Sequence, residues 1–533
     1  MNGTVRVLEW GTDWRYSRET ITRQQVIVTL SLIVGLAIVL RFIHLGRESY
    51  WYDEIIMVRL ASMNWDTLIA RLVATGRPPL YVVLAKAWTD IFGTSEAGTR
   101  SLSAVLGILS VPLMYPVGEK LFNRQVGLIG ALIMALSSFQ VFYAQEFRYY
   151  SLVLLLTLLC VLFFLRGLES GRIADFILHG LCGALLFYTH MLAVLLLIAP
   201  GLYFLLRWRR FKALRWKWVL SQAIAVLGAL PWLLPELIKQ VQALTAPNAR
   251  TFAAGSWVLT PPLYAPIRTL MNFMILAREY MPLVAVAAGA VVLLVGVAAF
   301  VTVRGWRAWA AGLGELFAGL PAFVREASDG LLFGTLWLLG PILFVFLGSR
   351  VLSSFYVDRY MITAAPALYL LVAVAIVYVR EAVPLPVALA VLGIWLGGAL
   401  YTYYVEPVKD QWRETAAFVE ANAENGDVLA FSHEHGKPTI ARTVEEAFMW
   451  YYDGEAETCH VEVQHGVELL SAGLGECVTD RGRVWVVVWE FIPDPTDVEA
   501  YFDGGQASAI ELLDVERFYG TRVYLFNIVE DLQ

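Results

Sequence analysis

Long apolar runs separated by short polar segments dominate the chain up to Tyr404. A helix needs about 20 apolar residues to cross a bilayer, and several of these runs approach or reach that length. A soluble core cannot hide so much apolar surface, so the pattern predicts an α-helical polytopic membrane protein. The clearest runs are Val26–Leu45, Gly127–Ala144, Leu152–Leu165 with its flanks, Leu283–Val303 and Met361–Val379.

The composition agrees with this pattern. Of the 533 residues, 58% are hydrophobic and 16% are charged, whereas soluble domains carry roughly a quarter charged residues. No small-residue cleavage site follows the first run, so we expect a retained first helix rather than a removed signal peptide. The net charge of −6 does not indicate nucleic-acid binding, because the basic residues lie in short loops between the apolar runs.

Lys and Arg in short loops favour the cytoplasmic side of a membrane. The richest basic cluster lies within residues 207–217. Placing it inside the cell predicts a multi-pass protein of the plasma membrane with a cytoplasmic N-terminus and about eleven spanning helices. The first loop (46–100), a second large loop (237–280) and everything after Tyr404 are then extracytoplasmic.

The first outer loop is expected to contain two helices that lie at the membrane surface. Pro79–Phe92 is apolar, but it is short, begins at a Pro-Pro pair and contains two charged residues. We therefore interpret it as interfacial rather than spanning. Met63–Val73 has apolar residues at helical spacing, and either Asn64 or Asp66 can cap it. This pattern predicts an interfacial amphipathic helix.

After Tyr404 the composition becomes that of a small α/β domain. The sequence thus predicts a transmembrane domain over residues 1–404 and a soluble extracytoplasmic domain over residues 405–533. Segments rich in Val and aromatic residues are the expected strands, with helices between them. The expected strands are Asp427–Ser432, Arg483–Glu490 and Thr521–Val529, and the expected helices are Thr443–Tyr452 and Asp494–Phe502.

The four cysteines divide between these two parts. Cys160 and Cys182 lie in apolar runs and are expected to be small core residues. Cys459 and Cys477 lie in the outer domain, where an oxidising compartment favours a disulfide. Two unpaired thiols are the alternative.

The most informative polar motif is Ser49-Tyr50-Trp51-Tyr52-Asp53-Glu54, just after the first run. Aromatic residues at a membrane boundary are ordinary interface anchors, and adjacent carboxylates there can be solvated loop charges. The functional interpretation is that Asp53 acts as a general base, or as a metal ligand, where a lipid headgroup meets water. A general base must lie within hydrogen-bond reach of the proton that it removes. Both interpretations stay open at this point.

Two further motifs bring charge to the same predicted side. Arg77 lies in the proline-fixed turn Gly76–Tyr81, where it can bind a phosphate through two hydrogen bonds or extend towards lipid headgroups. Glu146 and Arg148 bring opposite charges to membrane level. Such residues are costly there unless they face a cavity or each other.

The last two motifs also lie at predicted outer helix ends. His190 follows Tyr188-Thr189, and a lone histidine is more often structural than catalytic. Arg359 in Asp358-Arg359-Tyr360 can pair with an anion or with Asp358 alone. Taken together, the five motifs suit chemistry on a phosphate-bearing lipid. The sequence has no nucleotide-binding glycine loop, Walker motif or His/Cys metal cluster, so nothing in it supports energy input from a nucleotide.

In these motifs the chain resembles the GT-C membrane glycosyltransferases. The most similar group contains the protein O-mannosyltransferases and bacterial lipid A aminoarabinose transferases (glycosyltransferase family 39-like). The resemblance spans roughly the first 420 residues and implies a GT-C fold with a small C-terminal α/β domain. The matching segments are Asp53-Glu54, Arg77–Tyr81, Arg100–Ala104, Gln145–Tyr150, Tyr188–His190, Asp358–Tyr360 and Lys409–Arg413.

The resemblance implies an inverting transfer of a hexose or pentose from a polyprenyl-phosphate donor lipid to a glycan, lipid or protein acceptor. Asp53 is then the expected general base, with Glu54 beside it. The expected ligands of the donor phosphate are Arg77, Arg148 and Arg359, and the further pocket candidates are Glu146, His190, Tyr81 and Tyr360.

The resemblance leaves the metal question open. The aminoarabinose transferases carry an aspartate at the start of the span after the Gln145–Tyr150 turn, where this chain has Tyr150 and Ser151. A divalent cation, Mg²⁺ or Mn²⁺, is therefore one alternative, with Asp53 and Glu146 as its candidate ligands, and the absence of a metal site is the other.

Two other classes of function also fit a polytopic membrane protein. A glycolipid transporter or flippase predicts mid-membrane charges, discontinuous helices and paired repeats, whereas the charges here lie mostly at boundaries and no repeat is visible. A non-enzymatic scaffold whose outer domain binds a partner leaves the ordered set of motifs unexplained. Loss of transfer in a folded Asp53→Asn variant would separate an enzyme from both.

Overall fold

The computed structural model describes residues 21–245, 258–276, 327–351, 354–381, 383–434, 438–463, 482–490 and 510–528. Contacts divide the chain into two compact units. We call them the membrane unit (Met1–Ile43, Ala61–Gly93 and Gly98–Tyr403) and the C-terminal unit (His44–Leu60, Thr94–Ala97 and Tyr404–Gln533). The C-terminal unit therefore includes two short segments of the first outer loop as well as the expected soluble tail.

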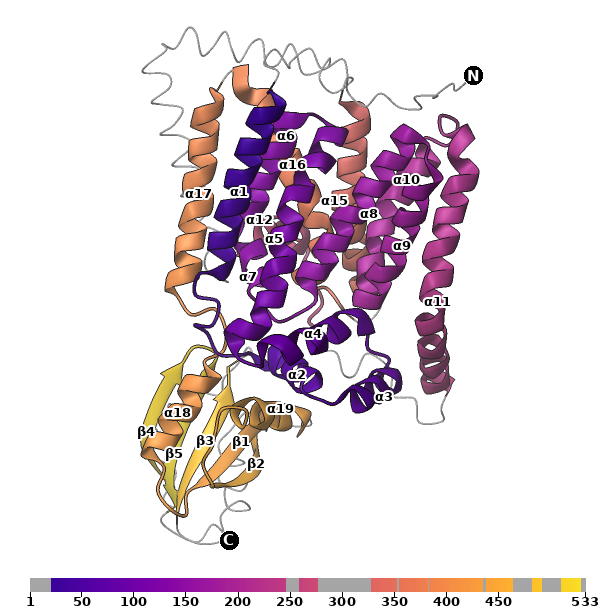
Figure 1. The fold of residues 1–533 in the computed structure, drawn as a ribbon. Coiled ribbons are helices and arrows are strands. Elements are labelled where there is room, and N and C mark those ends of the chain that lie inside the picture. Colours follow the sequence, from indigo (N-terminus) through magenta and orange to yellow (C-terminus); the bar gives the residue numbers. More distant parts are fainter. Residues whose placement is uncertain are drawn as a thin grey trace. The chain divides into compact units, whose positions relative to one another are not determined.

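The membrane unit is a bundle of helices that run side by side (Figure 1). Its helices are α1 (Arg23–Phe42), α3 (Trp65–Thr75), α4 (Pro79–Phe92), α5 (Glu96–Leu121), α6 (Arg124–Leu136), α7 (Ser138–Ala144), α8 (Tyr150–Ser170), α9 (Ile173–Thr189), α10 (Ile198–Leu206), α11 (Arg215–Thr245), α12 (Ala265–Met274), α15 (Ser328–Val351), α16 (Ala365–Tyr378) and α17 (Leu385–Val405). Short 3₁₀ segments are η1 (Met191–Leu197), η2 (Lys212–Leu214), η4 (Asp358–Ala364) and η5 (Val379–Glu381).

The prediction of a polytopic helical membrane protein is confirmed. Among the described residues, seven helical stretches are long and apolar enough to cross a bilayer, or eight if the bent pair α6–α7 counts as one span. Two shorter apolar helices, Ile173–Thr189 and Met191–Leu206, lie beside them. The expected span Leu283–Val303 falls outside the described residues, so the total of about eleven stays a prediction.

The basic turns expected to face the cytoplasm gather at one end of the membrane unit. Arg124, at the start of α6, donates to the carbonyl of Ile21 just before α1. Lys217, near the start of α11, donates to the carbonyl of Gly171 after α8. Further ion pairs at these helix ends are Lys120–Glu169, Arg166–Asp175 and Arg207–Asp329. These contacts place the turns at one end of the bundle, as the charge pattern requires; that this end is cytoplasmic stays a prediction.

The run Gly127–Ala144, expected as one continuous span, is broken in the structure. Helices α6 and α7 meet at an angle of 61°. Ser137 lies at the break and caps α7 by accepting a hydrogen bond from the Gln140 amide at 3.3 Å. Arg41, which is buried, donates to two carbonyls at the end of α6 at 3.4 and 3.2 Å. The break is stable in an apolar setting because these polar side chains satisfy backbone groups that the missing helical turn leaves open.

The two helices expected at the membrane surface lie across one end of the bundle (Figure 1). Asn64 caps α3 by accepting a hydrogen bond from the Thr67 amide at 2.8 Å, and Gly76 ends the helix with φ +67°. Helix α4 has 14 residues and a length of about 21 Å. Since the apolar core of a bilayer is about 30 Å thick, α4 is too short to cross it, in agreement with the interfacial interpretation.

The C-terminal unit contains helix α2 (Tyr52–Ala61) from the first outer loop and a five-stranded sheet of order β2-β1-β3-β5-β4. Strand β1 is parallel to β2 and β3, whereas β5 is antiparallel to β3 and β4. The remaining elements are α18 (Trp412–Asn422), α19 (Pro438–Phe448), β1 (Val428–Glu434), β2 (Glu457–Val463), β3 (Arg483–Trp489), β4 (Ile510–Phe518) and β5 (Thr521–Ile528).

The three expected strands correspond to β1, β3 and β5, and one expected helix overlaps α19. The sequence did not predict β2, β4 or α18, and the expected helix Asp494–Phe502 lies outside the described residues. Cys160 and Cys182 are buried and free, as expected. Cys459 is in a disulfide, but Cys477 lies outside the described residues, so the pairing between them stays a prediction.

Candidate functional site

An aromatic–arginine cluster lies at the end of the membrane unit where α8 begins, opposite the basic turns at which α8 ends. The ring of Tyr149 stacks on His190 at a centroid distance of 4.8 Å, and His190 lies 5.1 Å from the ring of Tyr360. The guanidinium of Arg148 lies over Tyr149 at 5.0 Å, and that of Arg359 over Tyr360 at 5.6 Å. The fold thus brings together three motifs that are far apart in the sequence.

The cluster contains two arginines and a histidine, and the carboxylates of Glu146 and Asp358 lie in the same chain segments. Burial, assisted by Arg148 and Arg359, lowers the pKa of His190 to about 3. The imidazole is therefore neutral at physiological pH, and it contributes a polar ring rather than a third cation. Arginine keeps its charge in nearly all protein environments and offers paired donors that match phosphate oxygens. That these arginines bind the donor phosphate stays a prediction.

Tyr81 and Glu146 lie beneath the turn that carries Arg148. The Tyr81 hydroxyl is 2.8 Å from Ser103 Oγ, and Ser103 in turn donates to the carbonyl of Arg148 at 3.1 Å. The Tyr81 ring also packs edge-on against Phe147 at 6.0 Å. Tyr81 and Glu146 are both almost fully buried, at 1% and 0% exposed. Tyr81 therefore supports the turn from within, and the buried carboxylate adds negative charge beneath it.

Asp358, next to Arg359, holds the second outer loop. Its two carboxylate oxygens accept hydrogen bonds from Thr269 Oγ1 and Asn272 Nδ2, each at 2.5 Å. Both donors belong to α12, the described helix of loop 237–280. The carboxylate thus anchors α12 beside the segment that carries Arg359, which is a function beyond the simple Asp358–Arg359 pair considered from the sequence.

Arg77 occupies a different position, in the turn between α3 and α4. Its side chain is exposed. The turn itself is held by α11: Trp232 Nε1 donates to the carbonyl of Gly76 at 3.1 Å, and a Cβ at Gly76 would approach Glu236 Oε2 to 1.8 Å. Only glycine combines the positive φ with this close approach. The backbone beside Arg77 is therefore fixed while its guanidinium is accessible.

In the C-terminal unit, the carboxylates Asp53 and Glu54 lie in the first turn of α2. Negative side chains are stabilised there by the partial positive charge of the helix start. Asp53 is partly exposed. Glu54 is fully buried, and its Oε2 lies 2.9 Å from Lys409 Nζ, whose side chain is 4% exposed. The structure thus gives the two neighbours different environments, and only Asp53 is accessible from solvent.

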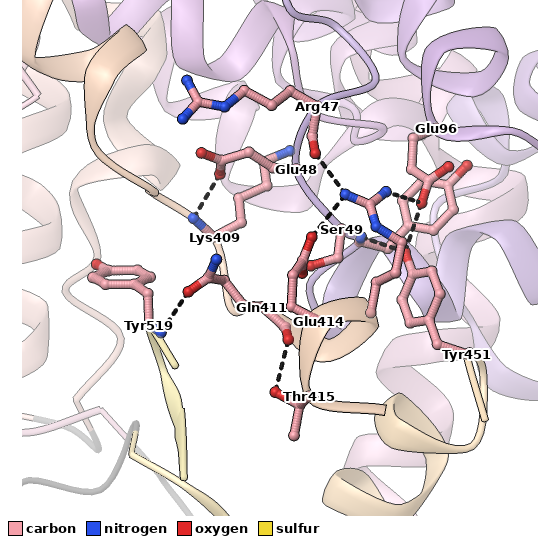
Figure 2. A network of polar contacts seen from close by, with 12 residues as sticks. Arg47, Glu48, Ser49, Glu96, Lys409, Gln411, Glu414, Thr415, Tyr451 and Tyr519 are labelled. Carbon is pink, nitrogen blue, oxygen red and sulfur yellow. Dashed lines mark hydrogen bonds and ion pairs between the residues drawn. The ribbon is translucent and has the colours of Figure 1, made fainter. Parts of the chain in front are cut away.

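A polar network joins the loop before α2 to the segment Lys409–Arg413 (Figure 2). The Glu48 carboxylate accepts hydrogen bonds from the amides of Val408 and Lys409 at 2.8–3.1 Å. Arg413 donates to the carbonyl of Arg47 at 2.6 Å and pairs with Glu96 at 3.2 Å. The three chain segments that make up the C-terminal unit are therefore linked by charged groups.

Asp410 lies inside this unit and makes its stability depend on pH. Trp489 Nε1 donates to Asp410 Oδ2 at 3.1 Å. Burial outweighs this bond and raises the pKa of Asp410 from 3.8 to about 7. The folded protein thus binds the proton more tightly than the unfolded chain does. Stability should therefore fall as pH rises from about 4 to about 7, and stay level above that range.

We expect Asp410→Asn to remove this dependence, because asparagine is neutral at every pH and still accepts the Trp489 bond. The stability gained relative to wild type at pH 8 should be up to about 4 kcal/mol and should vanish near pH 4. Melting temperatures of the two proteins across this range measure the effect, with Asp453→Asn, an exposed site of the same unit, as control. Equal pH profiles for wild type and Asp410→Asn would contradict the assignment.

The candidate metal ligands are not part of a cluster. Within the described ranges, no group of three or more His, Cys, Asp or Glu side chains could hold a metal ion. Asp53 belongs to the C-terminal unit and Glu146 to the membrane unit. The metal site with Asp53 and Glu146 therefore stays a prediction, and the roles proposed below are those of side chains.

Comparison with known proteins supports the resemblance to a family of glycosyltransferases. Residues 76–234 match the family described as dolichyl-phosphate-mannose-protein mannosyltransferase, a segment that includes Arg77 and the turn with Glu146 and Arg148. The crystal structure of ArnT from Cupriavidus metallidurans in the apo state is similar over 94% of this chain and 98% of that chain, with a TM-score of 0.53 and 14% identity. The chain is thus similar to the GT-C membrane glycosyltransferases and has an ArnT-like fold. The expected resemblance to this group is confirmed, whereas the roles of the short motifs stay predictions.

Two other solved structures show weaker similarity to this chain. ArnT from Cupriavidus metallidurans bound to undecaprenyl phosphate gives a TM-score of 0.47 at 13% identity, covering 95% of this chain and 98% of that one. The Archaeoglobus fulgidus oligosaccharyltransferase in complex with Zn and sulfate gives 0.43 at 14% identity, covering 78% and 61%. No curated protein sequence matches the chain.

Sequence reasoning missed two features of the candidate site. Lys409 was noted only as part of a family-like segment, and its ion pair with Glu54 links positions 355 residues apart. Thr269 and Asn272 were not singled out at all. Their spacing of three residues, which puts both on one helix face, is the only signal that could have suggested a shared partner.

Proposed function

We propose that this protein is a GT-C glycosyltransferase that transfers a sugar from a polyprenyl-phosphate donor lipid to an acceptor hydroxyl on the extracytoplasmic face of the plasma membrane. The observation that carries the proposal is the aromatic–arginine cluster, where two fixed cations, Arg148 and Arg359, flank a neutral histidine at one end of the membrane helices. The family matched by residues 76–234 supports the donor class, because its description names dolichyl-phosphate-mannose.

The proposed reaction is a single displacement that inverts the anomeric carbon. The acceptor oxygen forms a bond to this carbon while the bond from the carbon to the phosphate oxygen breaks. The acceptor proton passes to Asp53, and the electron pair of the broken bond leaves with the polyprenyl phosphate. Partial exposure of Asp53 supports its role as the base, because an acceptor must be able to reach it.

The arginines are proposed to stabilise the leaving phosphate. Charge develops on the bridging oxygen as the sugar departs, and preorganised cations in a poorly hydrated site stabilise that charge best. Arg359 and Arg148 are held against aromatic rings, so their orientation is fixed before the donor arrives. Arg77 is exposed beside a rigid turn and is proposed to contact the phosphate of the bound donor.

The test is release of polyprenyl phosphate by the full chain in lipid discs, measured across a panel of lipid-linked hexoses and pentoses with and without a membrane extract as the acceptor source. We expect release with one donor class, which also identifies the sugar. Absence of release from every donor, in folded protein with extract present, would refute the proposal.

One observation favours the alternative of a glycolipid transporter, namely the break between α6 and α7, since discontinuous helices are common in transporters. The same experiment separates the two functions. A transporter leaves the bond between sugar and phosphate intact, so intact donor would move between leaflets without release of polyprenyl phosphate.

A further inference from the structure

The ion pair between Lys409 and Glu54 is the most deeply buried charged contact in the described part of the C-terminal unit. The two side chains are 4% and 0% exposed, with Nζ and Oε2 separated by 2.9 Å. Removing both charges from water is costly, and replacing such a pair by neutral residues of similar volume is often no less stable. A gain in stability therefore does not explain this ion pair by itself. Its location next to Asp53 suggests a different role.

The backbone of Lys409 is fixed independently of its side chain. The Glu48 carboxylate accepts hydrogen bonds from the Lys409 amide at 2.8 Å and from the Val408 amide at 3.0 and 3.1 Å. One residue further on, the carbonyl of Asp410 accepts a hydrogen bond from Ser49 Oγ at 2.7 Å. The ammonium group is thus presented to Glu54 from a rigid segment.

That segment continues directly into the α/β fold. Gln411 and Tyr519 exchange two hydrogen bonds, from the Gln411 amide at 3.0 Å and from the Tyr519 amide at 2.8 Å. The Thr415 hydroxyl, in the first turns of α18, is 2.7 Å from the Thr521 hydroxyl at the start of β5. A shift of the sheet would therefore move Lys409 and, through its ion pair with Glu54, the first turn of α2.

We propose that Lys409 is a positioning residue: through Glu54 it lets the C-terminal α/β fold set the orientation of Asp53 for transfer. The inference rests on the proposed function of Asp53 as base. Because Asp53 and Glu54 are consecutive in one helical turn, a rotation of α2 that separates Glu54 from Lys409 also redirects the Asp53 carboxylate. A misplacement of this kind lowers the rate of the chemical step more than it lowers donor binding.

The chain offers a matched control on the same helix. Arg59, in the last turn of α2, pairs with Glu446 of α19 at 3.2 Å, and their side chains are 36% and 29% exposed. This contact also joins α2 to the α/β fold, but from the end of the helix that lies away from Asp53. A general loosening of α2 would affect both pairs alike, whereas positioning of Asp53 requires only Lys409.

The test uses the full chain in lipid discs and compares Lys409→Met/Glu54→Gln, Lys409→Arg and Arg59→Met with wild type. The double variant removes both charges, so it leaves no buried charge without a partner. We expect it to lower kcat for polyprenyl-phosphate release about tenfold to a hundredfold, with KM for the donor changed by no more than about threefold. Lys409→Arg keeps the positive charge and should retain most of the wild-type kcat. Arg59→Met should have the wild-type kcat.

Hydrogen exchange of the backbone amides in Tyr52–Ala61, measured without donor, completes the test. We expect faster exchange in the double variant than in Arg59→Met. If wild type releases no polyprenyl phosphate but exchange is faster as expected, the proposed function fails and the positioning contact stands. If wild type is active and the folded double variant has wild-type kcat and exchange, the positioning role is overturned while the transferase function stands.

Discussion

Asp53→Asn should reduce polyprenyl-phosphate release by about 10³- to 10⁴-fold, the upper part of the range that a positioned general base contributes. Asparagine has nearly the same shape but cannot accept the acceptor proton. The substitution also keeps an acceptor oxygen in the first turn of α2, where Asp53 lies, so the fold should persist. Single-turnover release with saturating donor measures the chemical step directly, and donor binding should change little.

The matched control is Asp66→Asn. Asp66 lies in the first turn of α3, another short helix of the first outer loop, and is exposed. It has the same helix position as Asp53 but no assigned role, so its variant should release polyprenyl phosphate at the wild-type rate. Comparable rates for Asp53→Asn and Asp66→Asn in folded protein would remove Asp53 from the mechanism.

Arg359→Met should lower kcat for release by about 10²- to 10³-fold, as expected when one preorganised donor to a developing charge is lost. Methionine preserves much of the apolar contact with the Tyr360 ring, over which the guanidinium lies at 5.6 Å. The loss should therefore be electrostatic rather than structural. Steady-state release and the melting temperature, measured together, separate these two causes.

Arg359→Lys should recover part of the rate, because lysine restores the charge but not the paired geometry of the guanidinium. Arg71→Met provides the control, since Arg71 is an exposed arginine of α3. A normal rate in Arg359→Met, with Arg148→Met strongly impaired, would transfer the phosphate-stabilising role from one arginine to the other. Normal rates in both variants would exclude the cluster as the phosphate site.

The apolar periodicity and the turn chemistry predicted most of the fold. Runs of apolar residues located most of the described spanning helices, and of the two caps considered for α3, the structure shows Asn64. The break between α6 and α7 was not predictable, because its run is continuously apolar and the stabilising arginine, Arg41, lies in a different helix. Local sequence carries no information about a partner of this kind.

The sequence also predicted part of the candidate site. Motif order suggested Arg148, His190 and Arg359 as candidates, and the fold brings them together through stacked rings. The different environments of Asp53 and Glu54 could not be foreseen, because they depend on Lys409, far along the chain. In the α/β fold, β2 and β4 were missed because polar or charged residues occupy about half of each strand, although their alternation with apolar residues, as in Glu457–Val463, is itself a strand pattern.

The composition of the C-terminal unit from three separate chain segments has a consequence for biogenesis. His44–Leu60 leaves the ribosome several hundred residues before the strands of the sheet are made. During synthesis, the helix that carries Asp53 therefore lacks its contacts with residues after Tyr404 until the last spanning helix has been made. Contacts between such distant segments form late in folding. A chain terminated near Tyr404 would therefore lack the sheet and the contact of Lys409 with Glu54, next to the proposed base.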